Sequence, residues 1–117
     1  MIQISFFKYG NKVIGFEISG HSGYATVGHD IVCAAISSTS QMTANGIIAL
    51  ASDTSINLCD DTGYLLVKLT KPEEDNRKAE LLLSSFSLFV DMVKEQYYKF
   101  MNVENIQTKE EVRNNGD

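Results

Sequence analysis

The sequence predicts a two-layer α+β sandwich, with two helices on one face of an antiparallel or mixed sheet, in the order ββαββα. Two pairs of short segments, rich in β-branched and aromatic residues, are each joined by a glycine-containing turn. Each pair is followed by a longer segment whose apolar residues recur at helical spacing. The chain has 117 residues and a mass of 13.0 kDa, which suits one hydrophobic core. Each ββα unit can place its helix on the same face of a shared sheet.

The first pair of strands is expected at residues 2–9 (IQISFFKY) and 12–19 (KVIGFEIS). Apolar residues alternate with other types along the second segment, which is typical of a strand with one buried face. Gly10 and Asn11 between the two segments form a typical tight turn. The chain therefore opens with a β-hairpin.

Residues 20–29 (GHSGYATVGH) are predicted to form a loop, and Asp30 is the expected N-cap of a helix over residues 31–51. The helical spacing predicts a core stripe made of Val32, Ala35, Ile36, Thr39, Met42, Thr43, Gly46, Ile47 and Leu50. The face that carries Cys33 also carries only small or polar residues: Ser37, Ser40, Gln41 and Ala44. Such a face lets another backbone approach closely.

The second pair of strands is expected at residues 55–59 and 63–70, around the turn Asp60-Asp61-Thr62-Gly63. Residues 77–99 show a second amphipathic pattern, formed by Leu81, Leu82, Ser85, Leu88, Phe89, Met92, Val93 and Gln96. A short last strand is expected near residues 100–106. We take residues 1–107 as a single α+β domain and residues 108–117 as a polar, flexible tail.

Composition restricts the classes of partner and the compartment. The formal net charge is -5 and the sequence pI is about 4.9, so direct binding of nucleic acid is not expected. We see no signal peptide and no apolar run near the ~20 residues that a membrane helix needs. Two cysteines, Cys33 and Cys59, do not make a disulfide framework. We therefore expect a cytoplasmic protein with free thiols and no membrane contact.

The residues with the clearest chemical potential lie between positions 20 and 38. Cys33 is expected near the third position of its helix, where unpaired N–H groups and the helix dipole stabilise a thiolate and lower its pKa. His21 precedes Cys33 by twelve residues, and a glycine-rich loop can bring its imidazole to the thiol. It could then act as general base, while N–H groups of the helix turn hold an oxyanion. These parts together suit acyl transfer.

Other interpretations of the same residues stay open. Asp30 could orient an imidazole, although capping is its more ordinary role, and its carboxylate would raise the pKa of the Cys33 thiol. His29 could replace His21 as the base, and Tyr24 could anchor the loop or contact substrate. Cys33 could also be an inert core residue. A metal site made of His21, His29, Asp30 and Cys33 lacks the usual zinc spacing, so no metal or cofactor is expected.

The motif G-H-S-G-Y-A-x-x-G-x-D-I-V-C-A-A-I-S over residues 20–37 resembles the signature of the ribosomal-processing cysteine proteases called Prp. The resemblance implies homodimeric enzymes that remove an N-terminal extension from large-subunit ribosomal protein twenty-seven. It also implies a catalytic pair that matches His21 and Cys33, and a loop that moves to admit substrate. Gly20, Gly28 and Asp30 match as shape and support, and Ser37 matches a residue that lines or supports the site. Ser22 and His29 depart from the residues common in the family.

The alternative within the same fold is a non-catalytic binding module for ribosome assembly. It would keep the sheet and helices without turnover, so a test of peptide cleavage separates it from the protease.

Overall fold

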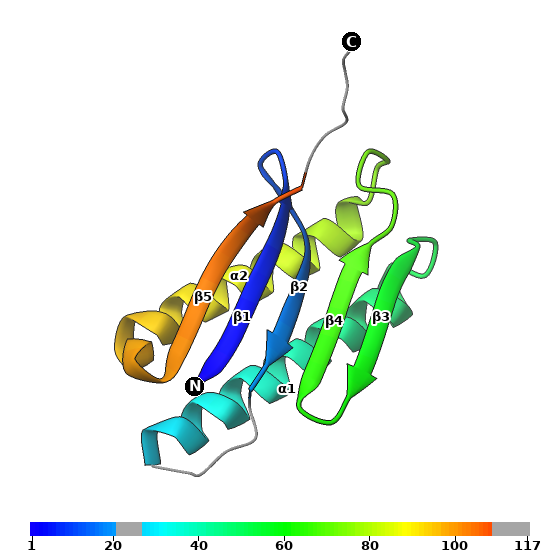
Figure 1. Cartoon of the computed structure of the whole chain (residues 1–117). Helices are drawn as coiled ribbons and strands as arrows, with labels where there is room; N and C mark the ends of the chain where they lie inside the picture. The colour runs from blue at the N-terminus through cyan, green and yellow to red at the C-terminus, as the bar shows by residue number, and fades with distance from the viewer. Residues whose placement is uncertain (21–26, 109–117) are drawn as a thin grey trace.

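The computed structural model describes residues 1–20 and 27–108, and for residues 27–29 it describes the backbone only. Along the chain these residues form the elements labelled in Figure 1: β1 (Ile2–Tyr9), β2 (Lys12–Ser19), α1 (Val27–Leu50), β3 (Ile56–Asp61), β4 (Tyr64–Leu69), α2 (Arg77–Tyr97), a 3-10 turn (Tyr98–Phe100) and β5 (Met101–Gln107). The predicted order ββαββα is confirmed, and so is the short last strand.

The strands of the described residues form one mixed sheet in the order β3-β4-β2-β1-β5. Neighbouring strands are antiparallel except for β1 and β5, which run parallel with Ile2 opposite Met101. Two parallel strands need a long connection, and here all the elements from β2 to α2 lie between β1 and β5 in the chain. β1 thereby lies inside the sheet, and β3 and β5 form its edges (Figure 1).

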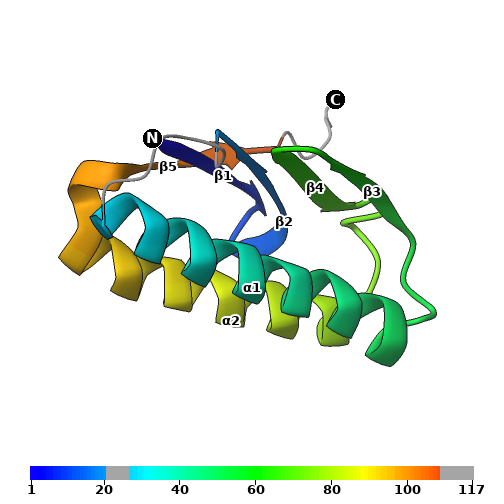
Figure 2. The same ribbon diagram turned by 90° about the horizontal axis from the view of Figure 1, so that it is seen from below.

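Both helices cover the same face of the sheet (Figure 2). The core between the two layers is apolar: Ile2, Ile4 and Phe6 of β1, Ile14, Phe16 and Ile18 of β2, and Leu65, Val67 and Leu69 of β4 meet the inward residues of the helices. Phe86 of α2 packs against the rings of Phe6 and Phe16, with centroid distances of 5.7 Å and 4.8 Å. The predicted two-layer α+β sandwich, with two helices on one face, is therefore confirmed.

The structure corrects the stripes expected on the two helices. On α1, Val32, Ile36, Thr43 and Ile47 are buried as predicted, but Met42 and Leu50 are exposed. On α2, the buried residues are Ala79, Leu83, Phe86 and Val90. The predicted α2 stripe was wrong for Leu81, Leu88 and Met92, which lie on the outer side of the helix layer and are exposed. Because α2 is apolar on two faces, periodicity alone could not tell which face meets the sheet.

Among residues 1–20 and 27–108, no helix is both long enough and apolar enough to cross a membrane.

Candidate active site

Helix α1 carries Cys33, and it begins earlier than the sequence predicted. Its first residue is Val27, so Asp30 lies in the first helical turn and the prediction of Asp30 as N-cap was wrong. An acidic residue is favourable both at the cap and in the first turn, where it meets the positive end of the helix dipole. The presence of Asp30 in the sequence therefore could not show at which residue the helix begins.

The earlier start moves Cys33 into the second turn of α1, six residues after Val27. The N–H groups without a helical acceptor are those of the first four residues, 27–30. The dipole effect weakens beyond the first turn. Cys33 therefore receives less stabilisation of its thiolate than its predicted position near the third residue would provide.

The surroundings of Cys33 favour the neutral thiol. Its side chain is half-buried and packs against the hydrophobic core. Burial raises the pKa of the Cys33 thiol above its ordinary value, and the negative charge of Asp30 raises it further. The positive N-terminal amino group of Met1 acts in the opposite direction and lowers this pKa. The predicted fall of the thiol pKa was wrong, whereas the predicted effect of the Asp30 carboxylate is confirmed.

The helix face that bears Cys33 continues into a small polar cavity. Ser37 follows Cys33 by one helical turn, about 6 Å along the axis at 1.5 Å per residue. The buried Ser40 hydroxyl donates a hydrogen bond of 3.1 Å to the Ser37 carbonyl. The cavity beside Ser37 has a volume of about 40 Å³ and is lined by Ile18, Ser37, Ser40, Gln41, Asp60, Asp61, Tyr64 and Leu65. Polar groups therefore lie along α1 beyond the thiol.

The far wall of this cavity includes Asp60 and Asp61 at the end of β3, which sequence reasoning did not assign to the site. They were expected as turn residues, and that prediction was wrong, because both pair with β4 as strand residues. They reach α1 because β4 pairs directly with β2, with Tyr64 opposite Ser19 at the end of the ladder. The Tyr64 hydroxyl donates a hydrogen bond of 2.5 Å to Glu17 Oε2 on β2. No local sequence signal indicates this approach, because it depends on the order of strands in the sheet.

The structure describes only some of the remaining predicted site residues. Gly20 directly follows β2 and has a φ of +79°. A Cβ at this position would lie 2.8 Å from the Met1 carbonyl oxygen, so both the backbone angle and the available space require glycine. Gly28 and His29 belong to the first turn of α1. His21 and Tyr24 lie outside the described residues, as does the side chain of His29. The distance between His21 and Cys33 therefore remains a prediction.

Within the described ranges 1–20 and 27–108, no three His, Cys, Asp or Glu side chains come together as a metal site would require. The metal interpretation used His21 and His29, whose side chains are not among those described.

Comparison with known proteins places the chain in a family. The family model described as cysteine protease Prp matches residues 1–102. The chain belongs to this family. As a member, it is a cysteine protease.

Individual relatives agree with this assignment. The ribosomal processing cysteine protease Prp of Bacillus subtilis (strain 168) is 27% identical over 101 residues, covering 83% of this chain and 90% of the relative. The Prp of Staphylococcus aureus (strain Mu50) is 31% identical over 87 residues, covering 74% of this chain and 80% of the relative. A crystal structure of Staphylococcus aureus Prp with a covalently linked product peptide superposes with a TM-score of 0.76 at 26% identity, covering 90% of this chain and 99% of that one.

Proposed function

We propose that this Prp-family chain removes the N-terminal extension of a large-subunit ribosomal protein, protein twenty-seven, with Cys33 as nucleophile and His21 as general base. The observation that carries the proposal is the position of Cys33. It lies half-buried on the α1 face that leads into the polar cavity at Ser37, in a chain that belongs to the cysteine protease Prp family. Relatives named for ribosomal processing support the substrate class.

The reaction begins with loss of the Cys33 proton. The imidazole of His21 takes this proton as the sulfur attacks the scissile carbonyl carbon, and a tetrahedral oxyanion forms. The C–N bond then breaks, His21 gives its proton to the leaving amine, and a thioester to Cys33 remains. A water molecule, deprotonated by His21, attacks the thioester, which releases the new carboxylate and restores the thiol. The covalently linked product peptide of the Staphylococcus aureus relative supports a covalent route.

The surroundings of Cys33 give the base a specific task. Burial and the Asp30 carboxylate raise the pKa of the Cys33 thiol, which favours the neutral thiol over the thiolate. A neighbouring base that accepts the proton during attack removes the need for a stable thiolate. We therefore favour proton transfer to His21 within the reaction over a resting thiolate–imidazolium pair. The free N–H groups at the start of α1 are the candidate oxyanion donors.

The substrate is proposed to lie as an extended peptide along α1 between Cys33 and Ser37. The expected small-residue face is not open over its whole length, because Ser40 and Ala44 are buried. The net charge of -5 favours a basic protein substrate over an acidic one. A cytoplasmic location and a homodimeric state complete the proposal, and neither a cofactor nor a membrane takes part in it.

The test is incubation with the precursor of protein twenty-seven, followed by intact-mass measurement of both products. The wild-type chain should yield two fragments whose masses sum to the precursor plus one water. Cys33→Ala and His21→Ala should abolish cleavage. Cys59→Ala is the matched control, because Cys59 is the second cysteine of the chain, is exposed on β3 and should be dispensable. Cleavage by folded Cys33→Ala would contradict the assignment, and loss of cleavage in Cys59→Ala would point to the wrong sulfur.

A further inference from the structure

The cavity beside Ser37 offers hydrogen-bond acceptors to a group that enters it. Asp60 and Asp61 contribute two carboxylates to its wall, and both residues are exposed to solvent. The salt bridges of the described part of the chain join other residues, so no Lys, Arg or His within that part neutralises these carboxylates. The wall of the cavity therefore favours a positively charged group.

A buried hydroxyl provides a second, independent indication. Ser40 lines the same cavity and is only 3% exposed. Its hydrogen is donated to the Ser37 carbonyl, and no donor among residues 1–20 and 27–108 is directed at its oxygen. A hydroxyl oxygen can accept hydrogen bonds as well as donate one, and a buried acceptor without a donor is costly. The Ser40 oxygen therefore favours a ligand that donates a hydrogen bond.

Strand register decides which of the two carboxylates faces α1. Asp60 lies opposite Leu65, which is buried in the core, so Asp60 lies on the side of the sheet that the helices cover. Asp61 lies opposite Tyr64 on the other side of the sheet. One Asp61 oxygen already accepts a hydrogen bond of 2.7 Å from the Thr62 N–H. Asp60 is therefore the main candidate for direct contact, and Asp61 adds negative charge beside it.

The rest of the cavity is apolar and small. Ile18 and Leu65 line it and are 2% and 4% exposed. A lysine side chain matches this combination, because its methylene stem packs on apolar surface while its ammonium group donates hydrogen bonds. The volume of about 40 Å³ suits an ammonium group and the carbon next to it. It is far below the ~150 Å³ of a cavity that binds benzene, so an aromatic side chain does not fit.

We propose that this cavity is a subsite that holds a lysine side chain of the substrate, with the Asp60 carboxylate and the Ser40 oxygen as its acceptors. The subsite rests on the proposed function, which places the substrate beside Cys33. Along α1 the cavity extends from Ser37 to Gln41, about 6 Å to 12 Å beyond Cys33. An extended peptide advances by about 3.4 Å per residue. The lysine is therefore expected two to four residues from the scissile bond.

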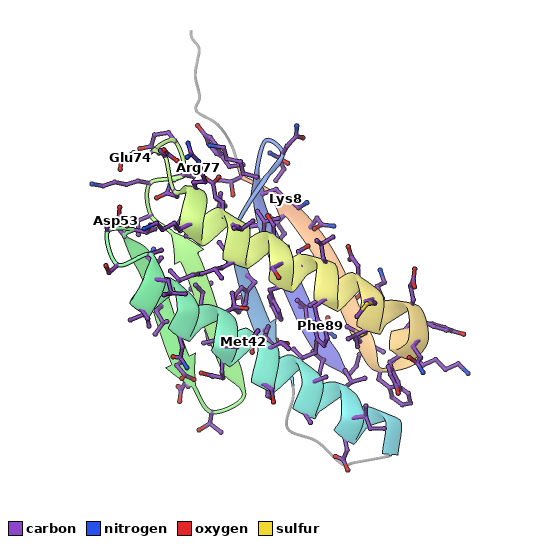
Figure 3. All side chains as sticks on the ribbon, turned by 180° about the vertical axis from the view of Figure 1, so that it is seen from behind. Lys8, Met42, Asp53, Glu74, Arg77 and Phe89 are labelled. Carbon is purple, nitrogen blue, oxygen red and sulfur yellow. The ribbon has the colours of Figure 1, made fainter. Side chains whose placement is uncertain are left out.

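Peptide binding tests the subsite without cleavage. The Cys33→Ala chain is titrated with a fluorescent peptide copy of the N-terminal region of the precursor, and with copies in which one lysine is replaced by glutamine. One replacement should weaken binding roughly 10-fold, the worth of a charge-assisted hydrogen bond. With Asp60→Asn added, the same replacement should matter less than about threefold. Asp53→Asn is the matched control, because it removes the same charge from the turn before β3, at the end of the strand remote from Asp60 (Figure 3), and should keep the full ratio.

Charge reversal tests direct contact. Asp60→Lys in the Cys33→Ala chain should prefer the peptide in which glutamate replaces that lysine. The subsite would be overturned if no lysine replacement weakened binding, if no peptide bound, or if Asp60→Asn weakened all peptides equally, as a structural role predicts. Equal cleavage of lysine and glutamine peptides by the active chain would overturn the subsite and leave the protease function intact. Lysine-dependent binding without any cleavage by the active chain would support the subsite and contradict the proposed function, so the two fail separately.

Discussion

Two glycines in this fold should respond to the same substitution with opposite signs. Gly15 lies in β2, opposite Lys68 of β4. A Cβ at Gly15 would lie 2.6 Å from the Val67 carbonyl oxygen and 2.7 Å from the Lys68 Cα, and neither backbone atom can move without disturbing the ladder. Gly46 lies within α1, where a Cβ would approach the flexible end of the Leu82 side chain, with Cδ1 at 3.4 Å and Cδ2 at 3.8 Å.

The expected magnitudes follow from these contacts. Overpacking at Gly15 costs about 1–3 kcal/mol, and the lower entropy of unfolded alanine returns about 0.5–1 kcal/mol, so Gly15→Ala should destabilise by up to about 2.5 kcal/mol. Gly46→Ala removes a helix-interior glycine and should stabilise by up to ~1 kcal/mol. For a chain of this length, each kcal/mol shifts the melting midpoint by roughly 3–6 °C.

Thermal unfolding followed by circular dichroism measures both variants. All samples should be compared at one protein concentration, because self-association would raise the apparent stability. A Gly15→Ala protein as stable as wild type would show that β2 and β4 can separate without cost, and the close-approach argument would fail. A destabilised Gly46→Ala protein would show that the Leu82 side chain on α2 cannot move to admit the added methyl group.

Three further outcomes are expected. Asp30→Asn should lower the pKa of the Cys33 thiol, because it removes a nearby negative charge. The pH at which cleavage and iodoacetamide labelling increase should therefore be lower than in the wild type. An unchanged pH profile would show that Asp30 does not raise the thiol pKa. Tyr64 should ionise at about 12 in the folded chain because its hydroxyl donates to Glu17, and ultraviolet titration of Glu17→Gln should show a lower pKa. Since the folded chain keeps that proton longer than the unfolded chain, stability should fall as the pH rises from about 10 to about 12, and an unchanged phenol pKa in Glu17→Gln would disprove the link. Phe86→Ala should cost about 3–5 kcal/mol in denaturant unfolding, and Phe86→Leu clearly less, because the ring fills the space between Phe6 and Phe16; equal losses would contradict this packing.

The strands were predictable because their pattern is local. Ile2, Ile4 and Phe6 alternate with other residues in β1, and one side of the strand must be buried, so the sequence defines both the strand and its inner face. The turn at Gly63, with a φ of +72°, was predictable in the same way, because glycine adopts that backbone angle without a steric cost. The motif around His21 and Cys33 identified the family without coordinates, because it lies within one short stretch of chain.

Tertiary structure decided what local patterns leave ambiguous. The apolar residues of α2 satisfy two stripes equally well, and only the fit of Phe86 between Phe6 and Phe16 selects the inner one. The start of α1 at Val27 moves Cys33 into the second turn, and burial beside Asp30 then raises a thiol pKa that its predicted position would have lowered. Asp60 and Asp61 reach the cavity at Ser37 only because β4 pairs with β2. Alternation and turn chemistry act between neighbours in sequence, whereas burial, charge proximity and strand order depend on residues that are distant along the chain.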